Sequence, residues 1–149
     1  MGGVTTYAAE VIVGGTVSGF AVVTDEPISF WGGLDPDSGE IIDRRHPLTG
    51  QNVAGKVLVL PHGRGSCSAS GVLLEAIRNG FAPAAIVVSR VDPIIGLGSI
   101  LGDELYARPI PVLRLEPDQW ASLRSGDYVE IELSGRLDVT RANDRTGGR

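Results

Sequence analysis

The spacing of hydrophobic and polar positions predicts strands in the first part of the chain. Residues 7–24 are rich in Val, Ile and Thr, which predicts two short strands joined by a turn at Gly14-Gly15. Residues 25–55 hold many turn formers and few apolar runs, so we expect one short strand at Ser29–Trp31 inside a long ordered loop. Within that loop, turns are expected at Asp35-Pro36-Asp37 and His46-Pro47.

The middle of the chain predicts a parallel strand–helix–strand unit. Lys56–Leu60 and Ala84–Ser89 are nearly continuous apolar runs, the pattern of strands that are buried on both faces. Between them, Ser68–Asn79 carries apolar residues at helical spacing, and Gly80 is expected to end the helix. A helix between two such strands predicts a parallel pair with a right-handed crossover.

The remaining segments predict further alternation of helix and strand, followed by a polar tail. The expected elements are a turn and short helix within 92–105, a strand at Ile110–Leu115, a helix starting within Glu116–Arg124 and a strand at Tyr128–Leu133. We expect one α/β domain over residues 1–140 with a mixed sheet, and a polar C-terminal tail over residues 141–149.

Composition narrows the class of protein. The net charge is -5 and the basic residues are scattered, which argues against a nucleic-acid partner. No apolar run approaches the ~18 residues that a membrane span needs, and the N-terminus lacks the pattern of a signal peptide, so we expect a cytoplasmic protein. Cys67 is the only cysteine and His46 and His62 the only histidines, too few for an iron–sulfur or zinc site held by this chain alone.

Candidate chemistry gathers in the loop HGRGSCSAS, which lies between a predicted strand and the helix that follows it. We take Ser66 as the candidate reactive residue, because the N–H groups at a helix start create positive potential. Gly63 and Gly65 let the backbone approach a ligand, and Arg64 adds a permanent charge. The alternative is that Ser66 simply caps the helix. Cys67 is interpreted as a buried packing residue rather than a reactive thiol.

The loop does not match several well-known motifs. It lacks the Lys of a phosphate-binding P-loop, the third glycine of a dinucleotide fingerprint, and the glycines that flank the serine of a hydrolase elbow. His62 lies four residues from Ser66 across a tight turn and has no obvious carboxylate to orient it, which argues against a serine–histidine pair.

Three stretches resemble a known family when they are taken in order. They are GGLDPDSGEIID, HPLTGQNVAGKVLVLPHGRGS and NGFAPAAIVV, within about residues 8–115, and they resemble the small subunit of aconitase X. The resemblance implies a swivelling β/β/α fold with a mixed sheet and flanking helices. It also implies a large-subunit partner that carries an iron–sulfur cluster, with no cofactor bound by this chain.

The resemblance also implies a role for the loop in a dehydratase. The family's catalytic serine lies in a G-K/R-G-S motif, which corresponds to Ser66, and it takes a proton from the substrate. Arg64, Gly65 and Gly63 are then expected to support the serine and bind substrate. Two activities are known in the family, and the string G-R-G-S-C-S-A-S favours cis-3-hydroxy-L-proline dehydration over phosphomevalonate dehydration.

Other roles stay open at this point. Gly32-Gly33 is a second candidate for contact with substrate or partner, although the pair also suits an ordinary tight turn, and His46 and Asn52 could line the same surface. A mobile phosphotransfer domain is an alternative function, but it needs a histidine where Cys67 stands. A non-catalytic anion-binding module is a third alternative.

Overall fold

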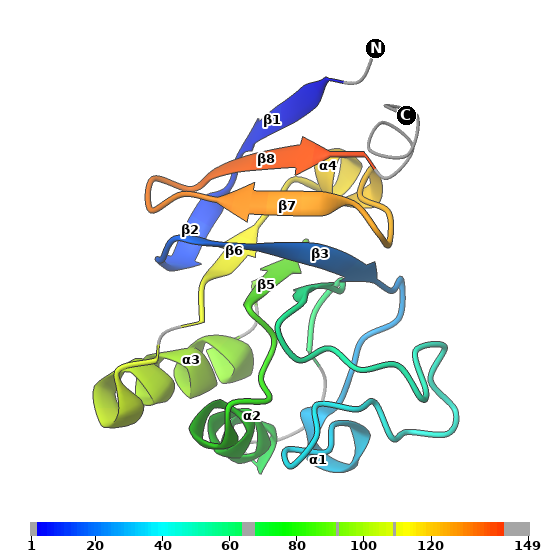
Figure 1. Ribbon diagram of the computed structural model, residues 1–149, viewed down its shortest axis with the longest axis vertical. Coiled ribbons are helices and arrows are strands. Elements are labelled where there is room, and N and C mark those ends of the chain that lie inside the picture. The colour runs from blue at the N-terminus through cyan, green and yellow to red at the C-terminus, as the bar shows by residue number, and fades with distance from the viewer. Residues whose placement is uncertain (1–2, 64–67, 92, 109, 142–149) are drawn as a thin grey trace.

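The computed structural model describes residues 3–63, 68–91, 93–108 and 110–141, which form an eight-stranded mixed sheet with helices packed against it (Figure 1). The strands are β1 (Val4–Ala8), β2 (Glu10–Val13), β3 (Val17–Val23), β4 (Val57–Val59), β5 (Ala85–Val88), β6 (Val112–Arg114), β7 (Tyr128–Ile131) and β8 (Arg136–Thr140). The helices are α1 (Phe30–Gly33), α2 (Ser68–Asn79), α3 (Pro93–Tyr106) and α4 (Pro117–Ala121).

The strand order makes the sheet curl round on itself. The order is β1-β8-β7-β3-β4-β5-β6-β2, so β1 and β2 lie at opposite ends of the sheet. Only Ala9 separates these two strands in the chain, and its N–H donates to the carbonyl of Gly135 at 3.0 Å. The two edges must therefore come close together, which leaves few exposed strand edges. Neighbouring strands from β3 to β6 are parallel, and the other pairs are antiparallel.

Alternate residues of the central strands enter two separate cores. Val57 and Val59 of β4 belong to a cluster enclosed by the curled sheet, whereas Leu58 and Leu60 belong to a cluster under the helices. All four side chains are fully buried. The reason is that successive residues of a strand point to opposite faces. Figure 1 shows α1, α2 and α3 together on one side of the sheet, where they cover the second cluster, and α4 near β8 at the other end.

The predicted strand–helix–strand unit is confirmed. Strands β4 and β5 are parallel neighbours, and α2 covers Ser68–Asn79 as expected. Gly80 ends the helix with a φ of +84°, a conformation that glycine adopts without steric cost. Strand β6, helix α4 and strand β7 also lie in the predicted segments. Thr49 N–H donates to the His46 carbonyl, and Ser38 N–H donates to that of Asp35, so both predicted loop turns are present.

Several sequence predictions are wrong. Residues Ser29–Trp31 do not form a strand, because the helix α1 begins at Phe30. Residues 7–24 contribute to three strands, and those on either side of Gly14-Gly15 do not pair with each other. The segment expected to hold only a short late helix is helical from Pro93 to Tyr106, since proline suits a first helical position. Strand β8 was not predicted.

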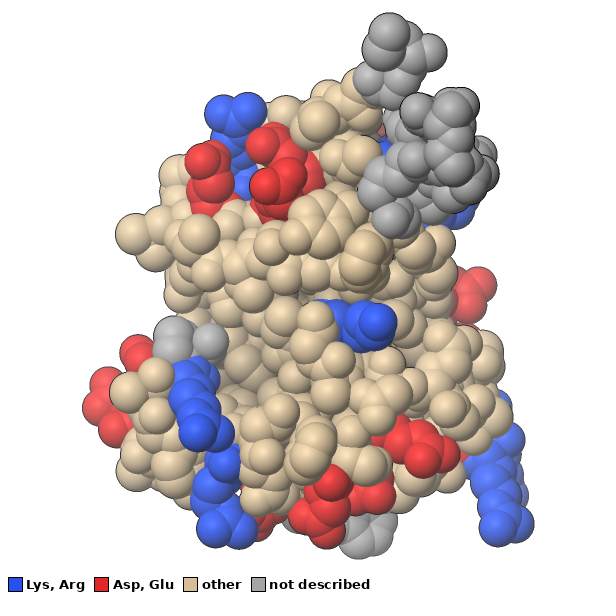
Figure 2. All heavy atoms as spheres, in the orientation of Figure 1, with Lys and Arg blue, Asp and Glu red and all other residues tan. Residues whose placement is uncertain are grey.

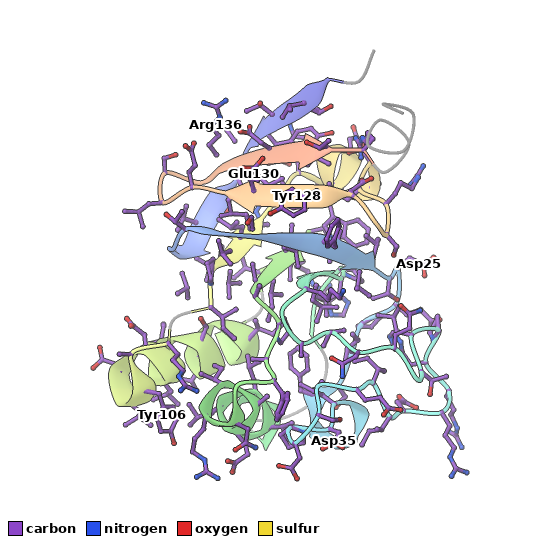
Figure 3. All side chains as sticks on the ribbon, in the orientation of Figure 1. Asp25, Asp35, Tyr106, Tyr128, Glu130 and Arg136 are labelled. Atoms are coloured by element: carbon purple, nitrogen blue, oxygen red, sulfur yellow. The ribbon has the colours of Figure 1, made fainter. Side chains whose placement is uncertain are left out.

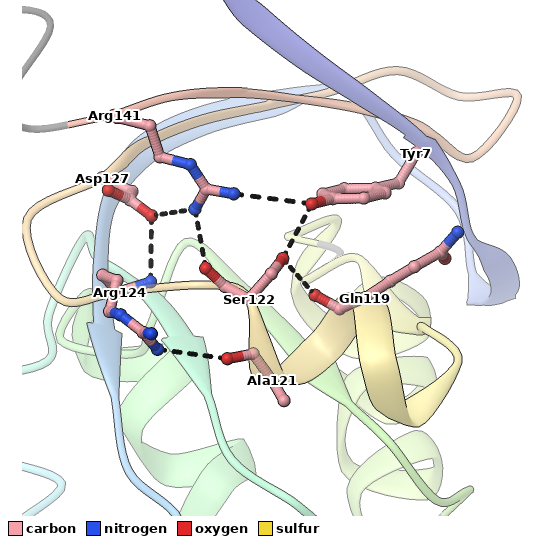
Figure 4. Close-up of polar contacts among 7 residues, drawn as sticks. All are labelled: Tyr7, Gln119, Ala121, Ser122, Arg124, Asp127 and Arg141. Atoms are coloured by element: carbon pink, nitrogen blue, oxygen red, sulfur yellow. Dashed lines mark hydrogen bonds and ion pairs between the residues drawn. The ribbon is translucent and has the colours of Figure 1, made fainter.

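A polar network closes one end of the curled sheet (Figure 4). The guanidinium of Arg141 lies 2.8 Å from the buried carboxylate of Asp127 and donates to the backbone carbonyl of Ser122. The hydroxyl of Ser122 is hydrogen-bonded to the Tyr7 hydroxyl at 2.7 Å, and Asp127 also accepts from the N–H of Arg124. The network joins β1, α4 and the end of β8, which lie far apart in the sequence.

Candidate active site

The carboxyl ends of the four parallel strands meet at one edge of the sheet, and residues 61–63, which lead into the candidate loop, follow β4 at that edge. Thr24 follows β3 and donates its N–H to the carbonyl of Val59 in β4 at 2.9 Å. Ser89 and Arg90 follow β5, and both backbone N–H groups donate to the carbonyl of Pro61 at 3.1 Å. The carboxyl edge of a parallel sheet is where α/β proteins place ligands.

Gly63 is held in place directly before the candidate loop. It forms a parallel bridge with Ile28, and its carbonyl lies 2.6 Å from Nδ1 of His62. A carbonyl can only accept a hydrogen bond, so Nδ1 of His62 carries the proton and donates. These two contacts hold the backbone at His62 and Gly63, shortly after the end of β4.

The other residues of the predicted loop, which are Arg64, Gly65, Ser66 and Cys67, lie outside the described residues. They join Gly63 to the first residue of α2, and a helix that follows a parallel strand starts at the carboxyl edge of the sheet. The catalytic role of Ser66 and the supporting roles of its neighbours therefore stay predictions.

The pair Gly32-Gly33 ends α1 close to the same edge. Gly32 has a φ of +77° and open space where a side chain would lie, so its backbone conformation is what favours glycine. A Cβ on Gly33 would lie 3.7 Å from the side chain of Ile28, the residue that pairs with Gly63. The carbonyl of Gly33 accepts the N–H of Ile42 at 2.9 Å. The pair therefore lies in the last turn of the short helix α1, next to Ile28, and its contact with substrate or partner stays a prediction.

His46 and Asn52 hold the long loop in its conformation. His46 is 5% exposed, and its Nδ1 accepts the N–H of Leu48 at 3.0 Å. Its Nε2 lies 3.4 Å from the carbonyl of Glu26, just beyond β3. The side-chain amide of Asn52 donates to the Ser38 carbonyl at 2.7 Å and accepts the N–H of Ala54 at 2.8 Å. Both polar side chains are thus engaged in local structure.

The structure adds Ser89 and Arg90 to the candidate site, two residues that our sequence interpretation missed. The Ser89 hydroxyl donates to the Pro61 carbonyl at 3.2 Å, so the end of β5 is tied to the segment that leads into the candidate loop. Arg90 is exposed and makes no side-chain hydrogen bond or ion pair with another described residue. The signal in the sequence was a hydroxyl and a cation placed directly after the buried run AAIVV.

The described part of the chain offers no metal site of its own. No group of three or more His, Cys, Asp or Glu residues gathers within it. In the same ranges, no helix has the length and apolar character to cross a membrane.

An almost closed mixed sheet with helices on one side defines a class of α/β domain, and comparison with known proteins identifies the family. The family model for the aconitase X swivel domain matches residues 6–139. The structure of Thermococcus kodakaraensis aconitase X (holo-form) is similar, with a TM-score of 0.82 and 33% sequence identity over 92% of this chain and 99% of that one. The chain therefore belongs to the aconitase X swivel-domain family, and the predicted swivel fold is confirmed.

Curated relatives are of two kinds. Cis-3-hydroxy-L-proline dehydratase of Pseudomonas aeruginosa is 44% identical over 130 residues, which make up 87% of this chain and 22% of that protein. The phosphomevalonate dehydratase small subunit of Methanopyrus kandleri is 43% identical over 119 residues, 79% of this chain and 84% of that subunit. The chain thus spans about a fifth of the first relative and most of the second.

Proposed function

We propose that the chain is the swivel-domain component of an aconitase X-type hydro-lyase and acts with a larger component to remove water from a hydroxy acid. The observation that carries this proposal is the position of Gly63, the first residue of the G-R-G-S motif, which is bridged to Ile28 at the carboxyl edge of the sheet. Relatives of the same family are named as dehydratases. The swivel fold is also the one that the family resemblance predicts.

In this proposal Ser66 is the base that takes a proton from the substrate carbon. A serine hydroxyl is a very weak acid, so strong positive potential must stabilise its alkoxide form. The N-terminal N–H groups of α2 and the guanidinium of Arg64 are the proposed sources of that potential. The first turn of α2 contains no acidic residue to oppose it.

An iron–sulfur cluster does not fit this chain by itself. Cys67 is the only cysteine in the sequence, and no group of three or more metal-ligating side chains gathers among the described residues. We therefore assign any cluster to the larger component. The chemistry assigned to this chain is the removal of the proton and part of the binding of substrate.

Arg90 is the residue that we add to the substrate site. Both candidate substrates carry anionic groups, a carboxylate in cis-3-hydroxy-L-proline and phosphate and carboxylate groups in phosphomevalonate. The guanidinium is a permanent cation whose planar N–H donors match such groups. The N–H of Arg90 donates to the carbonyl of Pro61, two residues before Gly63, and this hydrogen bond supports the assignment.

We favour cis-3-hydroxy-L-proline as the substrate. Loss of the proton at C2 and of hydroxide from C3 gives an enamine, which tautomerises to Δ1-pyrroline-2-carboxylate. The string G-R-G-S-C-S-A-S supports this choice. Phosphomevalonate is the second candidate, because the relatives named for it are almost as similar and match over most of their length.

The test is an assay of the chain alone and in complex with the large component from the same organism. Each preparation is offered cis-3-hydroxy-L-proline and phosphomevalonate in turn. The proposal predicts no turnover by the chain alone and dehydration of one substrate by the pair. Turnover of phosphomevalonate only would correct the substrate. A pair that dehydrates neither compound would contradict the proposed function.

A further inference from the structure

Apart from Ser99, helix α3 is apolar on the face that packs against the protein. Ile95 is buried, the buried hydroxyl of Ser99 donates to the carbonyl of Ile110, and a Cβ on Gly102 would lie 2.7 Å from the side chain of Ile77 in α2. A Cβ on Gly96 would lie 3.5 Å from the side chain of Ile12 in β2, an ordinary contact distance. Gly102 therefore lets α3 lie close against α2, and this face is fully used inside the fold.

The opposite face of α3 is also apolar over its first half. Leu97 is 43% exposed and Ile100 is 49% exposed, and residues three apart lie on the same face of a helix. Val91, just before the helix, is 46% exposed. No residue from Pro93 to Gly102 is charged. A surface helix normally carries polar residues on its outer face, and a helix that is apolar on all sides is normally buried.

The apolar half is the half nearest the candidate site. The chain enters α3 directly from the segment Ser89–Val91, at the carboxyl edge of the sheet. The charged residues Asp103 and Glu104 lie in the last turns, toward Tyr106, which Figure 3 shows at the far end of the helix. Figure 2 shows acidic side chains at this far end, on the left of the view.

Other exposed apolar residues have a different setting. Leu133, 69% exposed in the turn between β7 and β8, and Val11, 39% exposed on β2, both lie near Gly14. Leu105 is 60% exposed but follows the charged residues Asp103 and Glu104. Single or paired exposures of this kind are ordinary. The outer face of α3 differs because its apolar residues follow one another along one helix and adjoin the candidate site.

We propose that this surface, formed by Val91, Leu97 and Ile100, docks against the larger component of the enzyme. The proposal rests on the proposed function. The relatives indicate which protein covers this surface. The chain matches only 22% and 23% of the length of two cis-3-hydroxy-L-proline dehydratases, so most of each dehydratase lies outside the swivel domain. In the proposed function, the carboxyl edge of the sheet holds only part of the active site, so it must face the component that holds the rest. The apolar surface of α3 lies beside that edge, so the same component covers it.

The experiment measures association of the chain with its large component. Leu97→Ser and Ile100→Glu are compared with Leu133→Glu, a matched control on a more exposed leucine in the turn between β7 and β8. Each α3 variant is expected to weaken association by about tenfold or more, the effect of losing an apolar contact at the centre of an interface. The control should bind like the wild type, and turnover at saturating large component should be unchanged in all three. Because Leu97 and Ile100 are exposed, the urea midpoints should also be unchanged.

The outcomes separate this inference from the proposed function. If the wild-type pair forms and dehydrates its substrate but the α3 variants bind with unchanged affinity, the docking surface is wrong and the function stands. If the variants abolish self-association of the chain and leave the pair unaffected, α3 is an interface between copies, which also overturns the inference. If the wild-type chain does not associate with the large component, both proposals fail.

Discussion

Replacing Gly102 by alanine should destabilise the chain, whereas the same replacement at Gly96 should stabilise it. Both residues lie inside α3, where alanine is favoured over glycine by about 0.5–1 kcal/mol because glycine loses more backbone entropy. A Cβ at position 96 would meet Ile12 at 3.5 Å, an ordinary contact. We therefore expect Gly96→Ala to raise the free energy of unfolding by about 0.5–1 kcal/mol.

The environment of Gly102 reverses the sign. Its Cβ would lie 2.7 Å from Cδ1 and 3.1 Å from Cγ2 of Ile77, and 3.4 Å from the carbonyl of Arg108. Cγ2 lies on the stiff β-branched carbon, so Ile77 cannot relieve the contact by rotating its terminal methyl group alone. Overpacking of this kind costs about 1–3 kcal/mol, which exceeds the gain in helix propensity. The expected net loss is about 0.5–2 kcal/mol.

Urea unfolding followed by circular dichroism measures both variants on one scale. The slope of the free energy against urea should stay the same as in the wild type, so that a shift in midpoint reports stability. An equal gain from Gly96→Ala and Gly102→Ala would refute the close approach of α3 to α2. If α3 did not approach α2 closely, Gly102 would not mark the inner face of α3. The assignment of Leu97 and Ile100 to its outer face would then lose its support.

Three further changes test the polar network, the carboxylate of Asp138 and the substrate site. Arg141→Met removes the cation beside buried Asp127 and should lower the free energy of unfolding by about 2–3 kcal/mol. The loss is smaller than that of a fully buried ion pair because Arg141 is partly exposed. An unchanged midpoint of urea unfolding would contradict this. Hydrogen bonds from Thr6 and Arg136 lower the pKa of Asp138 below its ordinary 3.8, so its contribution to stability is present above that pH and is lost as the pH falls through the lowered value. Thr6→Val should raise this pKa in an NMR titration, and an unmoved titration curve would contradict the assignment. Arg90→Gln in the enzyme complex should raise KM by roughly 10- to 100-fold with a smaller change in kcat, the effect of losing a charge-assisted hydrogen bond, and an unchanged KM would remove it from the substrate site.

The strands and helix within residues 56–89 could be predicted because their hydrophobic pattern is typical of only one structure, a helix between two buried strands. Val57, Leu58 and Val59 are apolar without alternation, and both faces of β4 are buried as that pattern implies. Gly80 marks the end of α2 with the positive φ that a helix terminus often needs. In these segments the local pattern and the tertiary packing agree.

Helix α3 was harder to predict for two physical reasons. It is apolar on both faces, so it lacks the periodic contrast that identifies a surface helix. Its glycines also resemble turn formers, and only the contact between Gly102 and Ile77 explains why a glycine is needed there. Local propensity was overridden by close helix packing.

Long-range pairing explains the remaining differences in the fold. The strands on either side of Gly14-Gly15 looked like a hairpin, but β2 pairs with β6, and β3 pairs with β4 and β7. Their partners come much later in the chain, so no local signal could identify them. At the candidate site, the sequence identified the loop. The proposal for Arg90 depends on the hydrogen bond between its N–H and the Pro61 carbonyl, which arises only because β4 and β5 pair in parallel.

The proposed contribution of this chain to a two-component dehydratase is its serine base. The most direct test measures kcat of the complex formed with Ser66→Ala, compared with Ser68→Ala at the start of α2. We expect a loss of about 10²–10⁴-fold for Ser66→Ala, the usual contribution of a positioned acid or base, and a small change for Ser68→Ala. Unchanged turnover with Ser66→Ala in a complex that still assembles would show that Ser66 is not the base.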